Sequence, residues 1–164
     1  MPRIRNAPPG KGIVVQRDDR KLRLLFLCTG NSCRSQMAEG WARHLKSNSL
    51  LAFSAGIEPV ALNQLAVRAM AEAGVDISQQ QSKHLNQLKD VSFDYVITVC
   101  DHANKACPVF LGPTTVIHVP FDDPPLLARD AKSEEQAMRH YRRVRDDIRR
   151  FIETLPDALT GTSA

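Results

Sequence analysis

The stretch Leu24-Leu25-Phe26-Leu27-Cys28-Thr29-Gly30-Asn31-Ser32-Cys33-Arg34-Ser35 decides the fold and the chemistry that we predict for this chain. An apolar run ends at Cys28, a short loop follows, and Arg34 and Ser35 begin an amphipathic segment. This order predicts a buried strand, a tight loop and the start of a helix. Such a loop can direct its backbone N–H groups at one point, where the helix dipole and the Arg34 guanidinium also attract an oxyanion. The same groups favour a thiolate, so we expect Cys28 to have a low pKa and to attack the bound oxyanion.

The rest of the chain alternates between short apolar runs and helical stripes. The runs are typical of buried parallel strands and lie at residues 22–27, 50–53, 94–99 and 114–119. The helical patterns lie at residues 35–45, 63–74, more weakly 82–88, and from Ser133 to Leu155. This alternation predicts a small doubly wound α/β fold, with a four-stranded parallel sheet and helices on both faces. In such a fold the site lies at the carboxyl ends of the strands, where Cys28, Cys100, Asp122 and Asp123 follow.

Length and composition favour one soluble globular domain. The chain has 164 residues, of which 43% are hydrophobic and 24% charged, and its longest apolar runs are far shorter than the ~18 residues that a membrane span needs. Residues 1–23 hold seven basic and two acidic side chains, whereas residues 24–164 hold 15 and 16. We therefore expect a disordered basic arm over residues 1–20, a catalytic domain over 21–156 and a flexible tail over 157–164. A near-neutral domain gives no support for nucleic-acid binding.

Four cysteines without an export signal indicate a reducing compartment, and we expect the protein to be cytoplasmic. There the cysteines would be catalytic, redox-active, metal-binding or inert in the core. Their spacings of five and seven positions are poor matches to zinc sites, and the five histidines have no ligand spacing. No metal site is predicted from these residues.

The segment Cys-Thr-Gly-Asn-Ser-Cys-Arg-Ser-Gln-Met-Ala-Glu, residues 28–39, resembles the signature of the low-molecular-weight tyrosine phosphatase fold. More narrowly, it resembles the arsenate reductases of the thioredoxin-coupled type. Further matching segments follow in order and extend the resemblance over roughly residues 22–155: they are 54–56, 73–76, 82–84, 99–108 and 121–124. The resemblance implies a low-molecular-weight phosphatase-like fold.

The resemblance also implies roles for the residues of the loop and of the Asp-Pro segment. The oxyanion would be held by Thr29, Gly30, Asn31, Ser32, Cys33, Arg34 and Ser35. Asp123, directly before Pro124, would protonate the departing oxygen, because a hydroxide leaves far better as water. Asp122 would stabilise its loop. No cofactor is required, although some relatives place a monovalent cation near groups that correspond to Asn31, Glu39 and Ser54, and Lys83 stands where a further acidic ligand is expected.

Cys100 and Cys107 lie seven positions apart after the third predicted strand. If the segment between them is helical, their Cα atoms are roughly 10 Å apart, whereas a disulfide needs about 7 Å or less. A bridge between them therefore requires the segment to unwind, which favours a redox switch. The resemblance implies a disulfide relay through Cys28, Cys100 and Cys107 that an external dithiol reduces, with Cys33 not needed.

We therefore predict a monomeric arsenate reductase that converts arsenate to arsenite for detoxification, with phosphate and sulfate as competing oxyanions and thioredoxin as reductant. A glutaredoxin–glutathione donor stays open. The main alternative is a phosphotyrosine phosphatase that uses Cys28, Arg34 and Asp123 alone. That enzyme would need an aromatic wall near the Asp-Pro pair, where Leu126 and Leu127 stand instead. A non-enzymatic arsenical sensor would leave the arginine and the aspartate without a role.

Overall fold

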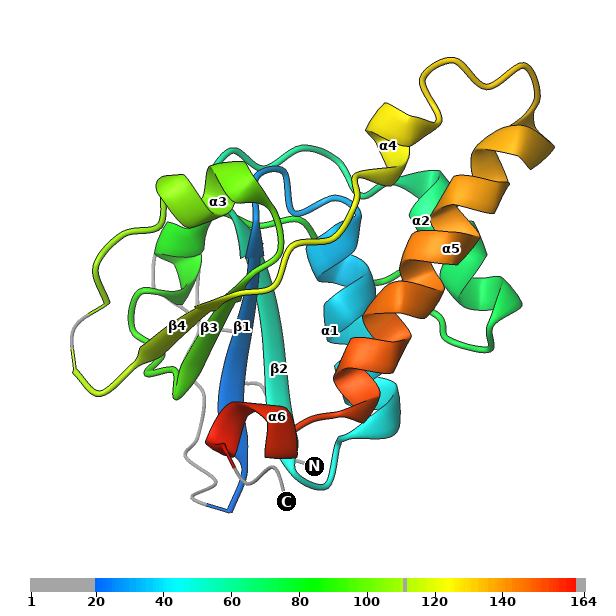
Figure 1. Cartoon of the computed structure of the whole chain (residues 1–164). Coiled ribbons are helices and arrows are strands. Elements are labelled where there is room, and N and C mark those ends of the chain that lie inside the picture. The colour runs from blue at the N-terminus through cyan, green and yellow to red at the C-terminus, as the bar shows by residue number, and fades with distance from the viewer. Residues whose placement is uncertain (1–19, 111, 162–164) are drawn as a thin grey trace.

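The sheet has the predicted number and direction of strands. The computed structural model describes residues 20–110 and 112–161. Its parallel strands lie side by side in the order β2-β1-β3-β4 (Figure 1), with β1 at Leu22–Cys28, β2 at Leu50–Gly56, β3 at Tyr95–Thr98 and β4 at Thr115–His118. In register, Leu24 lies opposite Ala52 on one side and Tyr95 on the other. The carboxyl ends of β1 and β3 are therefore neighbours, and the loops that follow them meet at one edge.

Helices cover both faces of the sheet, as predicted. They are α1 (Arg34–Leu45), α2 (Gln64–Glu72), the 3-10 helix η1 (Leu85–Leu88), α3 (Asp101–Lys105), α4 (Pro124–Leu127), α5 (Glu134–Glu153) and α6 (Asp157–Thr160). Helix α1 packs against β1, β2 and α5. The connection from β1 to β2 runs toward one edge of the sheet, and the connection from β2 to β3 runs toward the other edge. Because such crossovers are right-handed, η1 lies on the face of the sheet opposite to α1.

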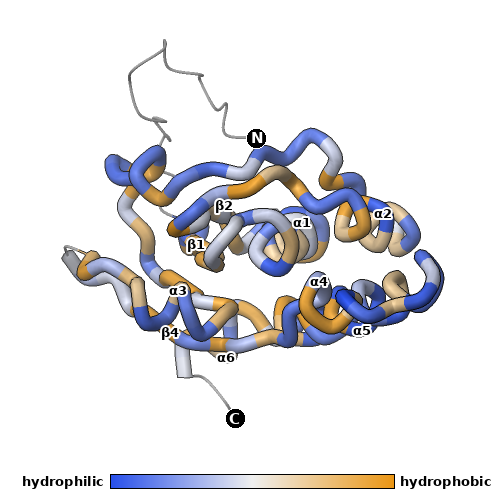
Figure 2. The backbone as a smooth tube through the Cα atoms, turned by 90° about the horizontal axis from the view of Figure 1, so that it is seen from above, coloured by the Kyte–Doolittle hydropathy of each residue, from blue (hydrophilic) through white to orange (hydrophobic). Residues whose placement is uncertain are grey.

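The core lies between the sheet and helices α1 and α5. Residues 24–27 of β1 are fully buried, and Trp41 of α1 is buried with its indole N–H donating to the Arg145 carbonyl at 3.2 Å. Figure 2 shows α5 alternating between hydrophobic and hydrophilic colours along its length. Its apolar stripe, Met138, Tyr141, Val144, Ile148 and Ile152, is buried. Full burial contributes about 1.5–3 kcal/mol for each large aliphatic side chain, so this stripe holds α5 against α1.

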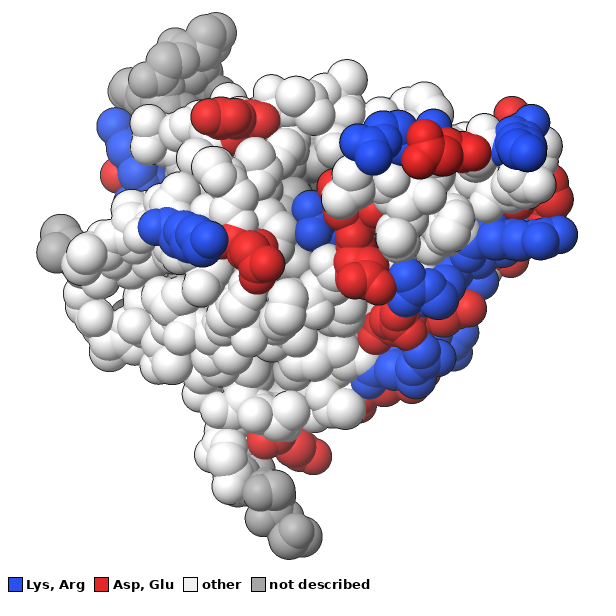
Figure 3. Space-filling model, turned by 45° about the horizontal axis from the view of Figure 1, so that its top comes forward, with Lys and Arg blue, Asp and Glu red and all other residues white. Residues whose placement is uncertain are grey.

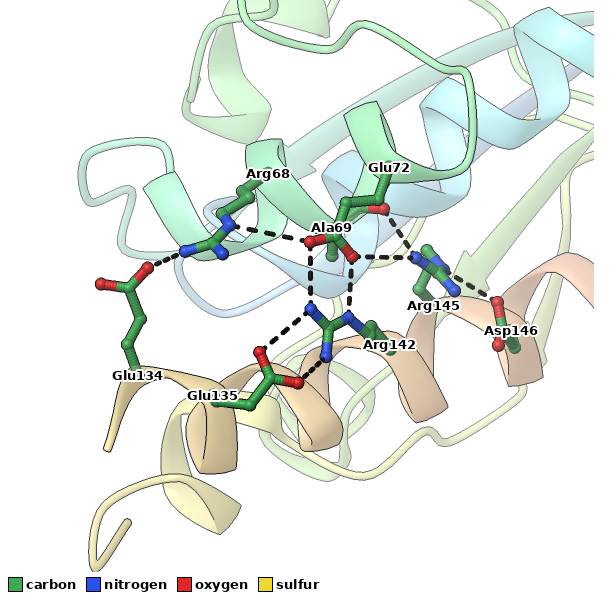
Figure 4. A network of polar contacts seen from close by, with 8 residues as sticks. All are labelled: Arg68, Ala69, Glu72, Glu134, Glu135, Arg142, Arg145 and Asp146. Atoms are coloured by element: carbon green, nitrogen blue, oxygen red, sulfur yellow. Dashed lines mark hydrogen bonds and ion pairs between the residues drawn. The ribbon is translucent and has the colours of Figure 1, made fainter. Parts of the chain in front are cut away.

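A network of ion pairs joins α2 to α5 at the surface (Figure 4). Glu72 of α2 accepts from Arg142 of α5 at 2.7 and 3.1 Å, and Arg142 also donates to Glu135 at 2.6 Å. The hydrogen bond from Arg142 lowers the pKa of Glu72. Figure 3 shows the resulting pattern, in which acidic and basic side chains interleave over one side of the molecule. The single pairs are exposed and weak, and they act together by fixing the side-by-side packing of the two helices.

Three short helices, α3, α4 and α6, have no clear counterpart in the sequence pattern because they are only four or five residues long. Helix α6 lies in the expected tail, and the carbonyl of its Leu159 accepts a hydrogen bond from the Tyr95 hydroxyl at 3.3 Å. The expected basic arm lies outside the described residues except for Arg20. Among the residues that the structure describes, we find no helix of sufficient length and apolarity to cross a membrane.

Candidate active site

The loop between β1 and α1 points its carbonyl groups outward. The carbonyl oxygens of residues 28–33 all accept hydrogen bonds from groups outside that segment. Their donors, in order, are Ile57 N, Glu58 N, Val60 N, Gln36 Nε2 with Ser82 Oγ, Asn63 N and Met37 N, at 2.6–3.3 Å. Because each trans peptide unit directs its N–H opposite to its C=O, the N–H groups of residues 29–34 point inward. This orientation is the one that the predicted anion site requires, and we call the loop of residues 28–34 the cradle.

The residue of the loop in the left-handed conformation is Asn31 and not Gly30. Asn31 has φ 48° and is fully buried. Its amide oxygen accepts from Lys83 N at 2.9 Å, and its amide nitrogen donates to Ser35 Oγ at 2.9 Å. Asparagine tolerates this conformation better than most side chains, and these bonds hold it there.

Gly56, at the end of β2, is needed because the loop approaches its Cα closely. A Cβ at this position would lie 2.6 Å from the Thr29 carbonyl oxygen and 2.9 Å from Asn31 N. Both are backbone atoms of the cradle and cannot move independently of it. The segment Ser54-Ala55-Gly56, one of the segments that carry the family resemblance, therefore packs directly against the loop through Gly56.

The Cys28 thiol lies inside the cradle, but its pKa differs from the expected low value. Its sulfur lies 2.8 Å from Ser35 Oγ and accepts from Asn31 N at 3.2 Å. Burial raises the pKa of Cys28, and these hydrogen bonds lower it only in part. The Arg34 guanidinium is directed elsewhere, which explains why the arginine does not provide the predicted thiolate stabilisation.

Arg34 connects the loop to the Asp-Pro segment. Its Nη1 donates to the Phe121 carbonyl at 3.0 Å, and its Nη2 lies 3.6 Å from Asp123 Oδ1. Asp123 is the N-cap of α4 but makes no capping hydrogen bond with its half-exposed side chain. Asp122 points to α5 instead and pairs with Arg143 at 2.9 Å. The carboxyl group near the loop is therefore that of Asp123, as expected.

Cys100 lies beside the loop, and Cys107 lies further along the chain. The Cys100 sulfur is 3.3 Å from the Thr29 hydroxyl and accepts from Ala103 N at 3.4 Å as the N-cap of α3. Cys107 follows α3 and is half-buried, which raises the pKa of its thiol. Cys33 is buried, and this burial raises its pKa as well. All four cysteines are free thiols, so the structure shows the reduced state.

The residues proposed for a monovalent cation do not fit one. The Glu39 carboxylate accepts from the Ser54 hydroxyl at 2.5 Å and pairs with Arg43 at 2.6 Å. Lys83 is close enough for Glu39 to oppose the lowering of the Lys83 pKa that burial causes. Two basic side chains thus neutralise the single carboxylate. Among the described residues, no three His, Cys, Asp or Glu side chains form a metal-binding group.

Sequence reasoning missed the side chains that support the loop. Gln36 is fully buried and donates to Asn31 O, and Gln80 donates to Gln36 Oε1 at 2.8 Å. Asn63, the N-cap of α2, also donates its side-chain amide to the Tyr141 hydroxyl at 3.0 Å. The available signal in the sequence was a glutamine directly before the apolar residues of an amphipathic helix. If such a side chain is buried, it needs hydrogen-bond partners.

The comparisons with known proteins agree with this fold and with the geometry of the loop. A family model described as low molecular weight phosphotyrosine protein phosphatase matches residues 23–162. The chain belongs to this family. It is 42% identical over 134 residues to an arsenate reductase of Halalkalibacterium halodurans, covering 82% of this chain and 94% of that protein. It is 45% identical over 138 residues to an arsenate reductase of Bacillus licheniformis, covering 82% and 97%.

A solved structure gives the same picture. The structure described as an arsenate reductase in the phosphate binding state superposes with a TM-score of 0.64 and 30% identity, over 82% of this chain and 95% of that one. The resemblance predicted from residues 28–39 is therefore confirmed at the level of family and fold.

Proposed function

We propose that this protein is an arsenate reductase that uses an intramolecular disulfide relay. The observation that carries the proposal is the placement of Cys100 beside the loop that holds Cys28: Thr29 contacts the Cys100 sulfur, and Asn31 donates to the Cys28 sulfur. A phosphatase needs only the loop cysteine, the arginine and the acid. The identity of 42–45% to arsenate reductases over most of both chains supports the same choice.

The first step forms a bond between sulfur and arsenic. Arsenate binds against the inward N–H groups of residues 29–34 and against Arg34, which can exchange its contact with the Phe121 carbonyl for the anion. The thiolate of Cys28 attacks arsenic, and Asp123 protonates the departing oxygen so that it leaves as water. The anion site thus presents arsenic to a nucleophile whose thiolate form is stabilised by hydrogen bonds from the Ser35 hydroxyl and the Asn31 N–H.

The second step reduces arsenic. The Cys100 thiolate attacks the Cys28 sulfur, the sulfur–arsenic bond breaks, and its electron pair stays on arsenic, which leaves as arsenite. A Cys28–Cys100 disulfide remains. Cys107 then attacks Cys100, which forms Cys100–Cys107 and releases Cys28 as a thiolate. The half-buried position of Cys107 after α3 makes the final disulfide the one that an external dithiol can reach.

We propose thioredoxin as that dithiol, on the cysteine spacing and on the resemblance. The test supplies purified thioredoxin, thioredoxin reductase, NADPH and arsenate. NADPH oxidation should be sustained by the wild type and lost in Cys28→Ser. Turnover of a phosphotyrosine substrate without arsenate-dependent NADPH oxidation, with either thioredoxin or glutaredoxin and glutathione, would establish the phosphatase alternative instead.

A further inference from the structure

The short helix between Cys100 and Cys107 must open for the relay, and this inference rests on the proposed function. Helix α3 has five residues, and Cys100, its N-cap, is buried. Cys107 follows the C-cap of this helix, and seven positions of helix would span roughly 10 Å, beyond the reach of a disulfide. An isolated helix of this length is unstable in water, so contacts from other elements must hold α3 closed.

Those contacts come from the end of the sheet. His118, the last residue of β4, places Nε2 3.0 Å from Asp101 Oδ1 and Nδ1 2.9 Å from the Thr98 hydroxyl. The same hydroxyl lies 3.2 Å from Asn104 Oδ1. Asp101 and Asn104 are three positions apart and share one face of α3. One imidazole and one hydroxyl thus reach both ends of the first helical turn.

The imidazole of His118 joins an exposed carboxylate to a buried hydroxyl. Because the Asp101 carboxylate can only accept, Nε2 carries the proton of that hydrogen bond. Nδ1 is paired with the Thr98 hydroxyl, which also reaches Asn104 Oδ1. Thr98 is fully buried, whereas Asp101 is largely exposed and His118 is partly exposed. The buried Thr98 hydroxyl therefore fixes the position of the imidazole, and the imidazole in turn holds Asp101 of the exposed helix α3.

We propose that His118 is a positioning residue that latches α3 onto the sheet, keeps Cys100 capped and buried beside the oxyanion loop, and sets how often α3 opens to let Cys107 reach Cys100. Asp101 and Asn104 are the helix side of this latch, and Thr98 is its fixed point. His118 contacts no reacting atom in the described structure, and it acts through α3.

Amide hydrogen exchange of the reduced protein tests the latch without any arsenate chemistry. The amides of Asn104 and Ala106 are bonded within α3, to the carbonyls of Cys100 and His102. In His118→Ala their exchange should accelerate about three- to tenfold, as expected from losing the hydrogen bonds of the imidazole to the buried Thr98 hydroxyl and to the largely exposed Asp101 carboxylate. Amides of β1 should keep their wild-type exchange rates. His102→Ala, which alters an exposed histidine on α3 itself, is the matched control and should change neither.

A double-mutant cycle separates a latch from general destabilisation. His118→Ala and Asp101→Ala should each accelerate α3 exchange, and the double variant should exchange no faster than the faster single variant. His118→Gln, which keeps a donor near Asp101, should restore part of the protection. Unchanged α3 exchange in His118→Ala, equal acceleration throughout the chain, or fold-changes that multiply in the double variant would each overturn the proposal.

The consequence for the relay is measured with diamide, a thiol oxidant, as the electron acceptor. His118→Ala should form Cys100–Cys107 faster than the wild type by the same factor as its exchange. An equal rate in the two proteins would contradict the latch. Failure of the wild type to reduce arsenate would remove the proposed function, while the exchange and diamide results would still decide whether the latch exists.

Discussion

Replacement of Gly56 by alanine tests how closely the sheet and the oxyanion loop depend on each other. The new Cβ would lie 2.6 Å from the Thr29 carbonyl oxygen and 2.9 Å from Asn31 N, so the cradle must shift. Overpacking of this kind costs about 1–3 kcal/mol, which for a chain of this size lowers the Tm by about 2–12 °C. A misplacement near 1 Å costs about 100-fold in rate, so kcat/KM for arsenate should fall by that order.

The assay combines thermal unfolding with calorimetric titration of phosphate, which we expect to bind in the same cradle. The matched control is Gly40→Ala in α1, whose Cβ would also lie 2.6 Å from its nearest neighbour, there the Ile77 side chain. Gly40→Ala should change the Tm and keep the affinity for phosphate, because the clash lies in the core and not at the loop. Wild-type phosphate affinity and activity in folded Gly56→Ala would refute the account of the loop.

Three further predictions concern single side chains of the site. Asp123→Asn should lower the arsenate turnover rate by about 10²–10⁴-fold and leave phosphate affinity in place, since the acid acts on the leaving oxygen; an unchanged rate in steady-state kinetics would assign the proton elsewhere. Ser35→Ala should raise the pKa of Cys28 further and slow its alkylation by iodoacetamide at pH 7 by about two- to tenfold, and faster alkylation would contradict the role of this hydroxyl. Burial raises the pKa of Cys33 above 9.0, so the stability that this thiol contributes is complete below pH 9 and is lost as the pH rises. Cys33→Ala should therefore reduce the fall of Tm with pH in alkaline solution. An equally steep fall of Tm in this variant would exclude Cys33 as its source.

The long elements could be predicted from sequence because their patterns are strong. The fully buried run at residues 24–27 and the helical stripe of α5 each repeat a single physical signal over many residues. The short helices α3 and α4 carry no such repeat, and tertiary contacts decide them. Helix α3 is one example, since side chains from β3 and β4 hold its first turn.

The site was predictable in its composition but not in its internal contacts. The order of Cys28, Arg34 and the Asp-Pro pair follows from local chemistry and from the resemblance. The direction of the Arg34 side chain, toward the Phe121 carbonyl and Asp123, depends on a segment almost 90 positions away. For the same reason the sequence predicted a low pKa for Cys28, whereas burial raises it in the folded chain. Desolvation is a property of the packed structure and has no local sequence signal.

The most direct test of the central claim is a single turnover without any external reductant. Reduced wild-type protein mixed with one equivalent of arsenate should yield one arsenite per chain and a Cys100–Cys107 disulfide in its peptide map. Cys107→Ser should also yield one arsenite but stop at Cys28–Cys100. If the arsenate stays unreduced and all four thiols of the wild type stay intact, the reduction mechanism is contradicted, whichever donor supplies electrons in the cell.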